Sequence, residues 1–100
     1  MMAARLHPAA EDDLLHALEY YEQQRHGLGG ELRRDFESTL GKVRLNPQSY
    51  AVVDASGIRY ASFHRFPYRL VFLELGDHLW IVAVSPHSRH PRYWSGRVNP

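Results

Sequence analysis

The C-terminal end of this 100-residue sequence gathers side chains that bind anions or transfer protons. Between Ser85 and Pro100 there is no acidic residue. The same stretch carries imidazole, guanidinium and aromatic groups: His87, Arg89, His90, Arg92, Tyr93, Trp94 and Arg97. Folding requires polar residues at a surface, but it does not require one sign of charge beside aromatic rings. This composition is typical of a surface that contacts a polyanion or an acidic partner.

Other arginines precede this segment on predicted strands. If the side chains alternate regularly, Arg59 and Arg65 share one face of a strand, and Arg69 lies on the next strand. Two helices are expected to cover only one face of the sheet, so we expect these arginines to point to the open face. There they would converge with the C-terminal groups into one cationic pocket. The predicted target- or phosphate-binding set is Arg59, Arg65, Arg69, His87, Arg89 and Arg92.

A second interpretation treats the arginines as an ordinary solvated surface, with Tyr93 and Trp94 anchoring the C-terminal segment to the core. The net charge is only +1, so the chain is not a bulk coat for nucleic acid. The distribution of charge is more informative. Residues 1–50 hold eight acids against six bases, whereas residues 51–100 hold three acids against six arginines. The asymmetry favours a binding or reactive surface in the second half.

Several other kinds of site are not supported by the sequence. Cysteine is absent, and the carboxylates are remote in sequence from His87 and His90, so we expect no metal site. Neither Ser85 nor Ser88 follows a nucleophile-elbow pattern. The glycines at 27, 29 and 30 lack the preceding strand and the trailing lysine of a phosphate-binding loop. We therefore expect no cofactor.

The elements that must position the basic groups follow from periodicity. Apolar residues at helical spacing predict helices over residues 8–24 and 30–45, separated by the glycines. Strand patterns cover residues 58–63, 68–75 and 78–85, with a tight turn at Gly76 and a short edge strand over residues 3–6. Within residues 79–84 both alternating faces are apolar, as in a central strand.

This order predicts an α+β fold in which an antiparallel helical hairpin packs on one face of a three- to four-stranded antiparallel sheet, in the order β-α-α-β-β-β. The length predicts a single domain over residues 1–100. The apolar share of 44% is that of an ordinary globular protein. No apolar run approaches membrane-spanning length, and the lack of cysteine suits a reducing compartment. We expect a cytoplasmic protein.

Several short elements follow one another along nearly the whole chain. They are Asp13-Leu14, Ala17 and Tyr20-Tyr21, then Asn46-Pro47, then Phe66-Pro67-Tyr68-Arg69, then Val82-Ala83-Val84, and finally His87-Ser88-Arg89-His90-Pro91 with Tyr93-Trp94. In the order and spacing of these elements the chain resembles the RelE/ParE superfamily of toxins from bacterial type II toxin–antitoxin systems, and the ParE-like branch in particular.

The resemblance implies one of two activities. ParE-like members bind and inhibit DNA gyrase, with no chemistry of their own, and arrest growth. RelE-like members cleave mRNA on the ribosome, which requires a base, an acid and cations for the phosphate charge. If the chain were such a nuclease, the catalytic residues would be Arg69, Arg89, His90 and Tyr93. The only lysine is Lys42, on the second predicted helix, whereas RelE carries strand lysines, so gyrase binding is favoured. In both cases the resemblance implies a small antitoxin as partner.

Overall fold

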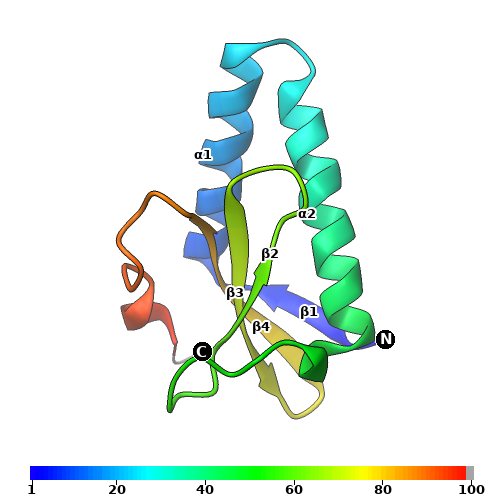
Figure 1. Cartoon of the computed structure of the whole chain (residues 1–100), viewed down its shortest axis with the longest axis vertical. Helices are drawn as coiled ribbons and strands as arrows, with labels where there is room; N and C mark the ends of the chain where they lie inside the picture. Colours follow the sequence, from blue (N-terminus) through cyan, green and yellow to red (C-terminus); the bar gives the residue numbers. More distant parts are fainter. Residues whose placement is uncertain (99–100) are drawn as a thin grey trace.

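The computed structural model describes residues 1–98 (Figure 1). Within these residues six principal elements follow the predicted order, together with two short 3₁₀ turns. The helices and strands are β1 (Ala3–Leu6), α1 (Pro8–Gln24), α2 (Leu28–Leu45), β2 (Arg59–Ser62), β3 (Tyr68–Leu75) and β4 (His78–Pro86). The turns span Pro47–Ser49 and Ser95–Arg97. No helix within residues 1–98 is both long and apolar enough to cross a bilayer.

Helix α1 begins where the local chemistry favours the start of a helix. Pro8 occupies the first turn, where its missing N–H costs nothing, and the Nδ1 atom of His7 accepts a hydrogen bond from the N–H of Ala9 at 2.9 Å. The buried stripe of α1 is Ala10, Leu14 and Ala17. The helix thus presents one narrow apolar face to the sheet, as its periodicity predicts.

Helix α2 begins two residues earlier than predicted because α1 caps it. The Glu22 carboxylate accepts hydrogen bonds from the N–H groups of Gly27 at 3.0 Å and Gly29 at 3.0 Å. These bonds satisfy donors that the first turn of a helix otherwise leaves free. The N–H of Gly27 and then that of Gly29 hold the pKa of the Glu22 carboxyl below its usual range. Gly27 itself has a φ of 90°, which closes the hairpin.

Close contact between the two helices depends on Gly29, which is buried. A Cβ atom at this position would lie 2.9 Å from the carbonyl oxygen of Leu18 on α1. We expect Gly29→Ala to lower the free energy of unfolding by about 1–3 kcal/mol, measured by urea denaturation. The matched control is Gly30→Ala, whose Cβ would find Arg34 Nη1 at 3.7 Å as its nearest neighbour. That variant should be as stable as the parent or up to about 1 kcal/mol more stable. Equal effects at the two positions would contradict this account of the helix contact.

The sheet has the strand order β1-β4-β3-β2. Strand β3 pairs antiparallel with both β2 and β4, as predicted. Strand β1 pairs parallel with β4, so the prediction of a wholly antiparallel sheet is wrong at this edge. A parallel pair needs a long connection, and the chain from the helical hairpin to the β3–β4 turn supplies it. The predicted architecture is otherwise confirmed.

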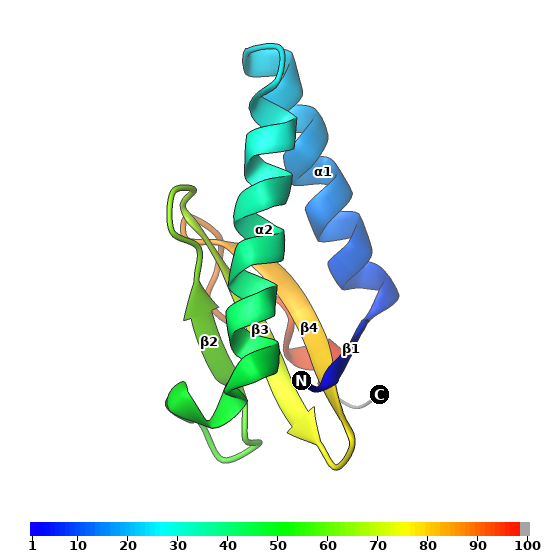
Figure 2. The same cartoon turned by 90° about the vertical axis from the view of Figure 1, so that its right-hand side faces the viewer.

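Two apolar cores lie on opposite faces of the sheet. Figure 2 shows both helices on one face and the C-terminal segment on the other. The helix-side core includes Leu32, Phe36, Phe72 and Ile81. The tail-side core consists of Ile58, Val71, Leu73, Val82, Ala83 and Trp94. The expectation of an open second face is therefore wrong, because residues 87–98 fold back and cover part of it.

A β-bulge adapts β4 to this second core. Val71 faces Ala83 across the ladder, but Phe72 faces Ile81, so Val82 is the extra residue. As a result Val82 and Ala83 both contribute to the tail-side core. The bulge at Val82 lies in the second half of β4, which ends at Pro86, and the basic C-terminal segment follows that strand.

Candidate functional site

The structure does not bring all the predicted arginines to one face. Arg59 and Arg65 flank Ala61 and Phe63, which belong to the helix-side core. The guanidinium of Arg59 donates a hydrogen bond to the carbonyl oxygen of Tyr50. Arg65 forms an ion pair with Glu31 of α2, with Nη1 and Oε1 2.5 Å apart. The prediction of a single cationic pocket on the uncovered face is therefore wrong for these two residues.

Arg69 lies on the predicted side and joins an aromatic layer. Its guanidinium carbon is 4.7 Å from the centroid of the Tyr60 ring. The Tyr60 ring meets the Trp94 ring edge to face, with centroids 6.3 Å apart. The guanidinium carbon of Arg92 lies 5.2 Å from the centroid of the Trp94 ring. Arg92 also forms an ion pair with Asp54, with Nη1 and Oδ2 3.0 Å apart. Arg69 of β3 and Arg92 of the C-terminal segment therefore lie on one surface, held by ring faces.

The Tyr93 ring contacts the other two arginines of the C-terminal segment, Arg89 and Arg97. The guanidinium of Arg89 lies 3.9 Å from the centroid of the Tyr93 ring, and that of Arg97 lies 5.0 Å from it. The Tyr93 hydroxyl donates a hydrogen bond to Asp13 Oδ2 at 3.1 Å. Predicted residues Arg89 and Tyr93 are thus brought together, but the tyrosine hydroxyl points to α1 and not to solvent.

Asp13 is the residue of this site that the sequence interpretation missed. Its carboxylate accepts hydrogen bonds from Arg97 Nη1 at 2.7 Å and from the N–H of Val84 at 3.2 Å, in addition to Tyr93. The Asp13 side chain is only 7% exposed. A signal was present in the sequence, because Asp13 falls on the apolar stripe of α1, three residues after Ala10. An acid on a buried stripe needs a partner, and the C-terminal segment provides it.

The surroundings of Tyr93 decide what its hydroxyl can do. Burial, and next the negative charge of Asp13, raise the pKa of Tyr93 to about 12. The phenol therefore stays protonated at neutral pH and cannot act there as an ionised general base.

Of the predicted catalytic set, His90 is exposed, and its Nδ1 accepts a hydrogen bond from the N–H of Arg92 at 3.3 Å.

Two cations of the surface remain without an acidic partner. Within residues 1–98, neither Arg69 nor Arg89 has a carboxylate oxygen within 4 Å, whereas Arg92 and Arg97 are both paired. His87, Arg89, His90 and Arg92 are exposed. We call Arg69, His87, Arg89, His90 and Arg92 together the tail surface. In the described residues 1–98, no three metal-ligating side chains come together.

The architecture is that of a small α+β domain: a helical hairpin on one face of a mostly antiparallel sheet, with an arginine-rich C-terminal segment on the other. Residues 4–91 match the family model described as the ParE toxin of the type II toxin–antitoxin system parDE, so the chain belongs to the ParE toxin family. The predicted resemblance to ParE-like toxins is confirmed. Comparison with curated proteins gave no match.

A solved structure shares the fold. The structure titled "Chromosomal ParDE TA system from P. aeruginosa" superposes with a TM-score of 0.75 at 17% sequence identity. The match covers 86% of this chain and 96% of that one. At this identity the likeness concerns the fold alone.

Proposed function

We propose that this chain is the toxin of a type II toxin–antitoxin module and that it arrests growth in the cytoplasm by binding and inhibiting DNA gyrase. Membership of the ParE family supports the proposal. The observation that carries it is the tail surface, whose Arg69 and Arg89 guanidinium groups are stacked on tyrosine rings without an acidic partner in residues 1–98. Fixed cations of this kind suit an acidic protein partner, because little conformational freedom is lost on binding.

Cleavage of mRNA on the ribosome is the alternative activity. It requires a base close to the phosphate-binding cations. Tyr93 is a poor candidate, since its hydroxyl donates to Asp13 and its pKa is about 12. Arg65 is directed to α2 and away from the tail surface. These observations favour a binding protein over a nuclease.

A parallel assay tests the proposal. The purified chain should inhibit supercoiling by gyrase and leave mRNA on stalled ribosomes intact. The double variant Arg69→Gln with Arg89→Gln should require at least about tenfold more protein for the same inhibition, because two charged contacts are lost. The matched control is Arg33→Gln with Arg34→Gln, which removes the same charge from exposed positions on α2. Unimpaired supercoiling, mRNA cleavage, or equal effects of the two variants would contradict the proposal.

A cognate antitoxin is expected to neutralise the toxin by covering cationic groups with acidic side chains. Expression of the chain alone should then arrest growth, and co-expression with the product of an adjacent short reading frame should restore it. Growth counts after induction measure both effects. Harmless expression of the folded chain without a partner would count against the assignment.

A further inference from the structure

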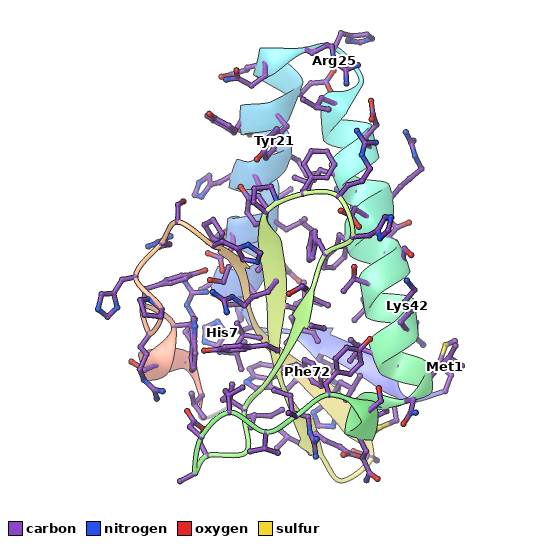
Figure 3. All side chains as sticks on the ribbon, in the orientation of Figure 1. Met1, His7, Tyr21, Arg25, Lys42 and Phe72 are labelled. Carbon is purple, nitrogen blue, oxygen red and sulfur yellow. The ribbon has the colours of Figure 1, made fainter. Side chains whose placement is uncertain are left out.

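A groove lies between α1, the start of β3 and the end of β4, next to the tail surface. It consists of two adjoining hollows of about 270 and 430 Å³ that share Tyr20, Tyr68 and Pro86 in their walls. Tyr21, Pro67, Ser88 and His87 complete the larger hollow, and His87 also belongs to the tail surface. Figure 3 shows Tyr21 on the inner side of α1, facing the loop that joins β2 to β3. We call this feature the tyrosine groove.

The walls of the tyrosine groove are held in place. The N–H of His87 donates a hydrogen bond to the carbonyl oxygen of Pro67 at 2.9 Å, which ties the end of β4 to the β2–β3 loop. The rings of Tyr20 and Tyr21 meet at 88° with centroids 5.1 Å apart. The rings of Tyr21 and Tyr68 meet at 68°, with centroids 6.2 Å apart. Rings set edge to face leave angular slots between them.

Two hydroxyls of the groove are available as donors. Within residues 1–98, no hydrogen bond joins the hydroxyl of Tyr20, Tyr21 or Tyr68 to a carbonyl or carboxylate oxygen. Burial, and then the neighbouring Tyr21 and Tyr20, raise the pKa of Tyr68 to about 12, so its hydroxyl keeps its proton. The Tyr20 side chain is well exposed, at 57% for the whole residue. The Tyr68 hydroxyl shares a hydrogen bond with that of Tyr21, so within residues 1–98 two of the three hydroxyl protons, those of Tyr20 and Tyr21, remain available to an acceptor on a ligand.

The smaller hollow has a cationic end. Arg89 and His16 line it, and Arg89 has no carboxylate partner within residues 1–98. Asp13 also lies there, but its oxygens already accept from Tyr93, Arg97 and the N–H of Val84. A ligand at this end is therefore expected to carry a negative charge.

We propose that the tyrosine groove binds an extended, proline-containing segment of a partner protein that carries an acidic residue beside the prolines. A polyproline II segment forms no internal hydrogen bonds, so its carbonyl oxygens are free to accept from the tyrosine hydroxyls. Its proline rings fit the slots between the angled tyrosine rings, as in aromatic-lined grooves that recognise such segments. The acidic residue meets Arg89. This inference does not depend on gyrase as the target of the tail surface.

Titration followed by ¹H–¹⁵N NMR tests the inference directly. The probe is a peptide of six prolines followed by two glutamates, added to the ¹⁵N-labelled chain up to millimolar concentration. We expect saturable shift changes at α1, the start of β3 and the end of β4. Tyr20→Ala should weaken binding at least about tenfold, since it removes a wall of both hollows. Tyr20→Phe isolates the contribution of the hydroxyl and should weaken binding less.

The controls separate this groove from other surfaces. Leu15→Ala removes a similarly exposed side chain from the same helix, 51% exposed and outside the groove, and should leave the affinity unchanged. A peptide with alanines in place of the prolines should bind at least about tenfold more weakly. Absence of shift changes at millimolar peptide, equal binding of the alanine peptide, or binding of oligothymidine in its place would each overturn the inference. Because gyrase is absent from this experiment, its failure would leave the proposed function standing.

Discussion

Replacement of Trp94 by alanine is expected to lower the free energy of unfolding by about 3–5 kcal/mol, the usual range for a buried aromatic side chain. Trp94 is only 1% exposed, although it lies six residues from the C-terminus of the sequence. It belongs to the tail-side core and meets the Tyr60 ring edge to face. Removing the indole leaves a cavity over the central strands and releases the surface on which Arg92 is stacked.

Urea denaturation followed by far-UV circular dichroism measures the effect. Trp94→Phe keeps most of the apolar contact and should cost clearly less than the alanine variant. If the C-terminal segment were a solvated appendage, Trp94→Ala would change the free energy of unfolding by less than about 0.5 kcal/mol. That outcome would remove the basis for a tail surface of fixed geometry.

The helices and the sheet could be predicted because each is encoded locally. The bounds of α1 follow from Pro8 and a stripe of apolar residues, and those of β3 match the predicted residues 68–75. The second core was also indicated in the sequence. Residues 79–84 are apolar on both alternating faces, and such a strand needs cover on both sides. An open sheet face conflicts with that pattern, and the C-terminal aromatics supply the missing cover.

The partners of individual charges could not be predicted, because they join positions far apart in the sequence. Arg65 pairs with Glu31 across 34 residues, and Arg97 pairs with Asp13 across 84. Local patterns assign a charged residue to an element and a face, but they do not say which opposite charge the fold brings to it. Arg69 and Arg92 lie over the aromatic rings of the face opposite the helices, whereas His87 and Arg89 line hollows beside α1. These positions, like those of Arg59 and Arg65, depend on tertiary contacts that local patterns do not contain.

Asp35 of α2 provides the second large expected effect. It accepts hydrogen bonds from three successive backbone N–H groups of the β2–β3 loop, those of His64 at 3.0 Å, Arg65 at 2.8 Å and Phe66 at 2.9 Å. The residue is 7% exposed. Asp35→Ala would leave these donors without an acceptor, so we expect the free energy of unfolding to fall by about 2–4 kcal/mol. Glu37→Ala, at an exposed position of the same helix, is the control and should have little effect.

The pH dependence of the Asp35 effect distinguishes a charged acceptor from simple packing. Burial tends to raise the pKa of the carboxyl, but the N–H groups of Phe66, Arg65 and His64 together outweigh it, and the pKa lies below the usual value. A depressed pKa in the folded state stabilises the protein above the unfolded value of about 3.9, and the contribution is lost as the pH falls through the folded value. The difference in stability between the parent and Asp35→Asn should therefore be constant near neutral pH and shrink below about pH 4. Urea denaturation at several pH values measures it.

A difference that persisted unchanged to pH 2 would show that the charge of Asp35 is not what holds the loop. The consequence extends to function, because this loop ends in Pro67, whose carbonyl oxygen accepts from the N–H of His87. One carboxylate on α2 thus fixes the loop that forms a wall of the tyrosine groove and orients the start of the C-terminal segment. Loss of Asp35 should therefore weaken peptide binding in the groove even where the variant remains folded.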